Sequence, residues 1–236
     1  PRATITERSS NGGFGKACNE GIAVTTTPFA LLLNPDCQID ADAVAELVAT
    51  LHRYPSAGIA APQSWLHDGT PQMCYRQAFF EPMARAVYRI PDATCSAKWL
   101  HGCCLLIRVD AFRRIGGFAE RFFLYSEDDD LCLRLRQAGF ECLLEPAANA
   151  VHAGGASSGT SLRVAFIKAY HYARSRHLAI RTYQGRSAAR TYLARTLVGA
   201  MPAVPLYILL LQRNYAVRWL AWGYAAFTSL WRPSRT

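Results

Sequence analysis

The chain has 236 residues, of which 51% are hydrophobic and 18% are charged, and this composition excludes an intrinsically disordered chain. Its length suits one domain of medium size with an appendage. The net charge of +9 is spread unevenly: residues 1–160 carry 14 Lys or Arg against 17 Asp or Glu, whereas residues 161–236 carry 12 Lys or Arg and no acidic residue. We therefore divide the chain at residue 160 and expect the two parts to meet different surroundings.

The first predicted element is a Gly-rich loop with the sequence SSNGGFGKACNEG, residues 9–21. Such a loop could bring backbone N–H groups and the amides of Asn11 and Asn19 to a phosphate or a base. It contains neither a Walker frame nor a Gly-x-Gly-x-x-Gly fingerprint behind a strand. The residues alone therefore leave its role open.

The run PFALLLNPD, residues 28–36, predicts a buried strand that delivers Asn34 and Asp36 at its end. A carboxylate in that place can hold a hard divalent cation, although a turn with Pro35 in its second position explains the sequence equally well. Asp40 or Asp42 is then expected to cap a helix that ends near residue 54. The apolar face predicted for this helix comprises Ala43, Leu47 and Leu51.

The middle of the chain predicts two further strands. Residues 57–63 read as a strand stopped by Pro62, residues 64–98 as a long loop, and residues 102–108 as a buried strand followed by a short helix. The eight cysteines include no Cys-x-x-Cys pair, and most lie in apolar runs. We expect them to be reduced core residues and see no zinc-site spacing.

Four consecutive acids, residues 127–130, open the next predicted helix. Ser126 and Asp129 fit a capping box, and the helix is expected to reach Ala138, with Gly139 as its stop. Asp130 can pair with Arg134 one turn later. By helical period Asp128 aligns with apolar positions, and an ionised carboxylate held there can act as a general base. A solvated acidic helix start explains the run equally well.

Residues 140–146 predict another strand, and a Gly- and Ser-rich loop centred on His152 follows. A lone histidine is more often a surface or hydrogen-bonded residue than a metal ligand. Strands that alternate with helices favour an α/β architecture with a largely parallel sheet. Ligands gather at the carboxyl ends of such strands, where Asp36, Asp128 and His152 are expected.

The tail from residue 161 has helical periodicity. Its uncharged run, residues 197–211, would reach about 22 Å as a helix and contains Pro202 and Pro205, so it falls short of a hydrocarbon core of roughly 30 Å. We predict a pair of helices lying in a membrane interface, with a helical cap or dimer interface as the alternative. The long uncharged runs disfavour nucleic acid as a partner.

Several segments in this order resemble glycosyltransferase family 2, in particular its bacterial rhamnosyltransferase-like branch. They are NGGFGKACNEGI, FALLLNPD, HGCCLLIRVDAFRRIGGFAERFFLYSEDDDLCLRLRQAGF and EPAANAVHAGGASSG. The resemblance implies a GT-A fold, a Rossmann-like, mostly parallel sheet flanked by helices, in residues 1–160. The family's opening strand and its nucleobase-binding segments have no match, so we expect this domain to be incomplete at the N-terminus. Residues 161–236 would be a basic helical extension associated with a membrane.

The resemblance also implies roles at matching positions. Asp36 takes the final place of the family's DxD-type metal motif, and His152 matches a histidine that ligates the metal in some relatives, which implies Mg²⁺ or Mn²⁺. Asp128 matches the second residue of the ED motif, the usual catalytic base. The remaining expected positions are Asn11, Gly13, Asn19 and Asn34 at the nucleotide or donor, His101, Gly102 and Glu127 near donor or acceptor, and Asp130 with Arg134 as structural support.

The implied activity is inverting transfer of one sugar from a nucleoside-diphosphate donor, with dTDP-rhamnose as the first expectation and UDP-hexoses open. The acceptor would be a lipid-linked glycan or a polysaccharide in cell-envelope synthesis, reached at the cytoplasmic face of a bacterial plasma membrane. Processive members carry a QxxRW motif that is missing here. The rival interpretation is a truncated, non-catalytic chain that serves as a membrane-associated interaction module.

Overall fold

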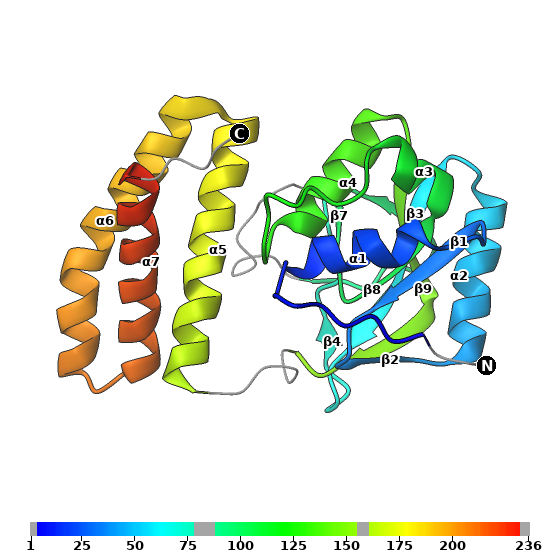
Figure 1. Ribbon diagram of the computed structural model, residues 1–236. Helices are drawn as coiled ribbons and strands as arrows, with labels where there is room; N and C mark the ends of the chain where they lie inside the picture. Colours follow the sequence, from blue (N-terminus) through cyan, green and yellow to red (C-terminus); the bar gives the residue numbers. More distant parts are fainter. Residues whose placement is uncertain (1–3, 78–87, 155–160, 232–236) are drawn as a thin grey trace.

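The computed structural model describes residues 4–77, 88–154 and 161–231, which form an α/β unit followed by three long helices (Figure 1). The strands are β1 (Phe29–Leu33), β2 (Cys37–Ile39), β3 (Ala57–Trp65), β4 (Pro71–Gln72), β5 (Tyr75–Arg76), β6 (Cys95–Ala97), β7 (Trp99–Leu100), β8 (Cys104–Arg108) and β9 (Glu141–His152). The main sheet has the order β1-β8-β3-β9-β2, with β4 paired to β3 and β6 paired to β9. β5 and β7 pair separately.

Among the described residues, the helices of the α/β unit are α1 (Phe14–Ala23), α2 (Ala41–Arg53), α3 (Val109–Arg114) and α4 (Glu127–Gln137). They cover both faces of the main sheet, because successive strand side chains point to opposite faces. Leu105 and Ile107 of β8 pack in one cluster with Leu131 of α4. Leu106, which lies between them in sequence, packs in another cluster with Leu47 of α2.

The main sheet is mixed, which corrects the expectation of a mostly parallel one. β3 and β9 run parallel, but β8 is antiparallel to both β1 and β3, and β9 is antiparallel to β2 and β6. The long connection after β3 returns the chain to the edge at which β3 ends, so β8 runs back beside it. The α/β architecture with helices on both faces is as expected.

Strand register brings distant segments together at one edge of the sheet. Leu33, the last residue of β1, stands opposite Cys104, the first residue of β8. Cys37, at the start of β2, stands opposite His152, the last residue of β9. The turn between β1 and β2 is tied to the segment before β8, because the Asn34 N–H donates to the Cys103 carbonyl at 2.9 Å.

Two strand ends differ from expectation. β3 does not stop at Pro62 but continues to Trp65, and β9 continues past Pro146 to His152. The parallel pairing of the two strands shifts register after Pro62: Pro62 stands opposite Glu145, but the next residue, Gln63, stands opposite Asn149. This irregularity accommodates both prolines, which lack the N–H that a regular ladder needs. His152 is therefore held at a strand end, and residues 155–160 of the predicted loop lie outside the described residues.

Helix boundaries follow local signals more closely. Asp40 caps α2 by accepting the Ala43 N–H at 2.7 Å, and Leu47 and Leu51 are fully buried, as expected. α4 ends directly before Ala138, and Gly139 has a φ of 87°, a left-handed conformation that favours glycine. The Gly-rich loop was predicted wrongly in part, because α1 occupies most of it.

The three C-terminal helices are α5 (Leu162–Tyr183), α6 (Gly185–Leu209) and α7 (Arg213–Trp231), and they lie side by side in Figure 1. α5 contacts the segment before α4: the Ser175 hydroxyl donates to the Leu124 carbonyl at 2.8 Å, and the rings of Phe123 and His171 stack with centroids 4.5 Å apart. α6 runs through its two prolines without interruption.

Within the described ranges, α6 is the helix long and apolar enough to cross a membrane, judged by length and composition. The uncharged run, residues 197–211, is by itself too short for such a span, but α6 begins several turns before it, at Gly185. α6 leaves much of its apolar surface exposed. The large exposed side chains on it are Val198, Met201, Leu206, Ile208 and Leu209.

Candidate active site

Asp36 and His152 come together at the sheet edge formed by the end of β1 and the end of β9. The His152 Nε2 lies 3.5 Å from the Asp36 Oδ1, and both side chains are nearly buried. The other ring nitrogen, Nδ1, lies 3.0 Å from the Gln72 Oε1. The imidazole is thus oriented by partners on both sides, as histidines that bind metals commonly are.

His101 and Cys103 extend this pair into a cluster that sequence spacing could not reveal. One ligand atom from each of His101, Cys103 and His152 lies within 4.8 Å of the others. His152 lies 49 positions after Cys103 in the chain, and it meets His101 and Cys103 because β8 and β9 both pair with β3. A search for closely spaced Cys and His pairs therefore misses them.

The chemistry of these donors decides which cation they fit. Imidazole and thiol ligands suit Zn²⁺ better than Mg²⁺, which prefers oxygen, whereas Mn²⁺ accepts an imidazole beside carboxylate oxygens. A hydrogen bond with Cys37, together with burial, raises the pKa of the Cys103 thiol to about 12. The thiol is therefore protonated at neutral pH, and the carboxylate of Asp36 with the imidazole of His152 is the stronger pair of donors.

Asp128 lies at the start of α4, against the backbone of Gly102. The Gly102 N–H donates to the Asp128 Oδ2 at 3.3 Å, and the Asp129 N–H donates to Oδ1 at 2.9 Å. Burial of the carboxylate raises the pKa of Asp128, and these N–H groups and the Arg76 charge oppose part of that rise. Gly102 directly follows His101, so two adjacent residues connect the carboxylate to the histidine cluster.

The other acids of the run have different surroundings. Asp129, interpreted from sequence as a helix-start residue, instead forms a buried ion pair with Arg76 at 3.1 Å. The Arg76 guanidinium lies 3.9 Å from the centre of the Trp99 ring. Sequence could not find this pair, because its members are far apart in the chain.

Asp130 is fully buried and accepts from three donors. The Arg134 Nε lies 2.7 Å from its Oδ2, the spacing expected one helical turn away. Arg121 and the hydroxyl of Tyr183 both donate to Oδ1, at 3.0 and 2.5 Å. Because Tyr183 belongs to α5, this carboxylate also attaches the C-terminal helices to α4.

The backbone before α4 adopts an unusual conformation. Tyr125 and Ser126 have φ angles of 68° and 65°, a left-handed region that residues other than glycine seldom occupy. In this conformation the Ser126 side chain makes no capping hydrogen bond, so the predicted capping box is wrong. Strained backbone of this kind clusters at functional sites.

Residues expected near a nucleotide lie around the start of α1. The Gly13 N–H donates to the exposed Asn11 Oδ1 at 3.0 Å. Gly13 has a φ of 89°, and a Cβ at this position would collide with the carbonyl of Phe123. Asn19 lies on α1, and its amide makes two hydrogen bonds to the backbone of Phe118, at 2.8 and 2.9 Å. Asn19 thus attaches α1 to the segment before α4. Contact of these residues with a nucleotide, like that of Asn34, stays a prediction.

Glu127 is buried, and within the part of the chain that the structure describes its Oε2 has no hydrogen-bond partner. Burial, followed by the charge of Asp128, raises the pKa of Glu127 from 4.5 to about 8. The folded state therefore holds a proton that the unfolded state releases at lower pH. Stability is expected to fall as pH rises from about 4.5 to about 8.

The Glu127→Gln variant should lose this dependence, because glutamine does not titrate. We expect the free energy of unfolding, measured by urea titration at several pH values, to fall less steeply for the variant than for the unmodified chain across that window. Glu120→Gln, a change at an exposed carboxylate, should keep the original slope. Equal slopes for Glu127→Gln and the unmodified chain would contradict the raised pKa.

Comparison with known proteins adds sequence relatives. A family model described as glycosyltransferase like family 2 matches residues 1–180. The N-acetylglucosaminyl-diphospho-decaprenol L-rhamnosyltransferase of Mycobacterium tuberculosis (strain CDC 1551 / Oshkosh) is 29% identical over 198 residues, covering 67% of this chain and 61% of that protein. Rhamnosyltransferase WbbL of Escherichia coli (strain K12) is 44% identical over 54 residues, covering 23% of this chain and 20% of that protein. The chain thus spans about three fifths of the mycobacterial relative.

Solved structures share the fold. The mannosyltransferase PcManGT from Pyrobaculum calidifontis, in complex with GDP-Man and Mn²⁺, aligns with a TM-score of 0.52 and 17% identity over 98% of this chain and 70% of that chain. GalNAc-T7 with UDP, GalNAc and Mn²⁺ aligns with a TM-score of 0.50 and 16% identity over 72% of this chain and 38% of that chain. At these identities the likeness shows the fold alone. The chain therefore has the GT-A fold and belongs to glycosyltransferase-like family 2, and two of its sequence relatives are named rhamnosyltransferases.

Proposed function

We propose that this chain transfers a single sugar, with inversion at the anomeric carbon, from a nucleoside-diphosphate donor to a lipid-linked or polysaccharide acceptor in cell-envelope glycan synthesis. The observation that carries the proposal is the placement of Asp128 against Gly102, next to the group of His101, His152 and Asp36. The carboxylate that would act as base and the side chains that would hold a metal thus lie on either side of the adjacent residues His101 and Gly102. The names of the rhamnosyltransferase relatives support rhamnose as the sugar.

Asp36 and His152 would hold a divalent cation, Mn²⁺ better than Mg²⁺, which when bound neutralises charge on the departing nucleoside diphosphate. Asp128 accepts the proton of the acceptor hydroxyl. The acceptor oxygen forms its bond to the anomeric carbon as the bond from that carbon to the phosphate oxygen breaks. Attack from the face opposite the leaving group inverts the configuration. Nucleotide contacts from Asn11, Gly13, Asn19 and Asn34 complete the proposed donor site.

The C-terminal helices support a place at the inner face of a bacterial plasma membrane. Residues 161–236 combine 12 basic residues and no acidic one with the exposed apolar side chains of α6. Basic residues attract anionic head groups, and apolar side chains enter the acyl boundary. α6 is also long enough to span, at about 1.5 Å per residue over its 25 residues. An acceptor anchored in the same membrane would then reach the site by diffusion in two dimensions.

Sugar transfer by the 236-residue chain tests the proposal. The purified chain would be incubated with dTDP-rhamnose or with UDP-hexoses, and with a prenyl-diphosphate-linked N-acetylglucosamine like that in the name of the mycobacterial relative. We expect a glycosylated lipid in the presence of Mn²⁺, its loss on chelation with EDTA, and its recovery when Mn²⁺ is restored. His152→Ala should abolish the recovery, because it removes one of the proposed donors. Absence of transfer with every donor would favour the non-catalytic interaction module.

A further inference from the structure

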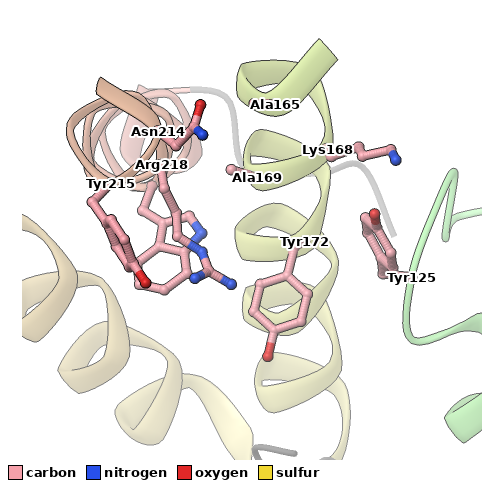
Figure 2. Close-up of a pocket in the computed structure, with 9 residues that line it drawn as sticks. Tyr125, Ala165, Lys168, Ala169, Tyr172, Asn214, Tyr215 and Arg218 are labelled. Atoms are coloured by element: carbon pink, nitrogen blue, oxygen red, sulfur yellow. The ribbon is translucent and has the colours of Figure 1, made fainter. Parts of the chain in front are cut away.

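A cavity of about 540 Å³ lies between α5, α7 and the segment before α4 (Figure 2). Its walls combine two cations with four aromatic rings. In Figure 2 Lys168 extends from α5 on the side of Tyr125, and Arg218 reaches from α7 toward Tyr172. The small side chains of Ala165 and Ala169, both on α5, also line the cavity. The full lining is Tyr125, Ala165, Lys168, Ala169, Tyr172, Asn214, Tyr215, Arg218 and Trp222.

The charge of this cavity selects for an anion. Lys168 and Arg218 line it, no acidic residue does, and residues 161–236 contain no Asp or Glu at all. The Arg218 guanidinium lies 5.2 Å from the centre of the Trp222 ring, a contact that helps to fix its direction. Guanidinium and ammonium groups are the side chains that bind phosphate oxygens most strongly.

Three of the rings around the cavity form a continuous row from α7 through α5 to the segment before α4. Trp222 stacks on Tyr172 with centroids 6.3 Å apart, and Tyr172 meets Tyr125 edge-on at 5.8 Å. Aromatic faces of this kind pack well against hydrocarbon. A ligand with an anionic group and an apolar chain therefore matches the lining better than a free phosphate does.

The position of the cavity points to the acceptor rather than to bulk lipid. Tyr125, on its wall, precedes the proposed base Asp128 by three residues. An anion held there lies beside Tyr125, in the segment before α4, and near Ala165 in the first turn of α5. A phospholipid that merely anchors the protein would have no reason to bind next to the base.

We propose that this cavity binds the diphosphate and the first isoprene units of a prenyl-linked acceptor, with Lys168 and Arg218 contacting phosphate oxygens and the aromatic row contacting the hydrocarbon. The inference rests on the proposed sugar transfer and assigns the acceptor subsite of that same reaction. Holding the diphosphate here would present the attached sugar hydroxyl to Asp128. The two cations would then determine affinity for the acceptor and not the chemical step.

The proposal is tested by titrating the 236-residue chain with geranylgeranyl diphosphate in uncharged detergent micelles. Binding is monitored by tryptophan fluorescence. Lys168→Gln and Arg218→Gln should each weaken binding ~10-fold or more, because each removes a charge-assisted contact. Arg195→Gln makes the same charge change at an exposed position of α6 outside the cavity and should leave binding within ~2-fold of the unmodified chain. Arg218→Lys, which keeps the charge, should bind with an affinity between those of Arg218→Gln and the unmodified chain.

Equal affinity of all variants for the prenyl diphosphate would overturn the proposal. So would equal competition by vesicles of phosphatidylglycerol, which would identify the cavity as a general lipid site. In the transfer assay the cavity variants should raise KM for the lipid-linked acceptor and leave kcat unchanged. If the unmodified chain binds the prenyl diphosphate through Lys168 and Arg218 but transfers no sugar, the proposed activity fails while the binding site stands.

Discussion

Replacing Asp128 by asparagine is expected to lower the kcat of sugar transfer by a factor on the order of 10²–10⁴, the usual contribution of a positioned general base. Asparagine keeps the shape of the side chain and can still accept the Gly102 N–H, but it cannot take the acceptor's proton. The raised pKa of Asp128 also predicts that the acidic limb of the kcat/KM profile lies above the ordinary range for aspartate. Initial rates as a function of pH measure both effects.

Two comparisons make the Asp128 result specific. Asp42→Asn changes an exposed carboxylate in the first turn of α2 and should leave the rate unchanged. Binding of the nucleotide and the acceptor should survive in Asp128→Asn, since the loss concerns proton transfer. A variant that folds, binds both substrates and turns over at near the original rate would show that Asp128 is not the base.

Replacing Asp130 by alanine is expected to lower the free energy of unfolding by about 3–5 kcal/mol, the cost of removing one member of a buried ion pair. The carboxylate is fully buried, and Arg121, Arg134 and Tyr183 would all lose their shared partner. Because Tyr183 lies on α5, the same change should loosen the attachment of the C-terminal helices. Urea unfolding, with hydrogen exchange in residues 161–183, measures the two effects.

A graded series tests whether the whole network is responsible. Tyr183→Phe removes only the hydroxyl and should cost about 1.5–3 kcal/mol, the range for a hydrogen bond to a charged group. Glu120→Gln disrupts only an exposed pair with Lys16 and should change stability by less than about 1 kcal/mol. Unfolding of Asp130→Ala at the same urea concentration as the unmodified chain would refute the structural role given to this carboxylate.

The active-site residues divide according to whether their partners are local. The pair of Asp130 with Arg134 follows from helical spacing, so sequence suffices to predict it. The pair of Asp129 with Arg76 does not, because the two residues meet only when β5 packs beside the start of α4. The burial of Glu127 and the raised pKa of its carboxyl group also depend on packing, so neither its place in an acidic run nor its family position predicted them.

By itself the sequence determined features that depend on neighbouring residues and on the order of motifs. A cap by Asp40 or Asp42, the apolar face of α2 and the glycine that follows α4 can be predicted from short windows, because capping and helical period act within a turn or two. The order of the NPD, acidic and His152 segments indicated the family and the GT-A fold. The uneven charge predicts a division of the chain at residue 160.

Only the tertiary structure decided the direction of the strands, the extension of β9 to His152 and which residues surround that histidine. Strand direction depends on where a long connection returns the chain, and no local propensity records that. The cluster of His101, Cys103 and His152, like the cavity between α5 and α7, is made of residues that approach only through packing. Contacts between distant segments are set by how complete elements bury their apolar faces together, and this is a property of the whole fold.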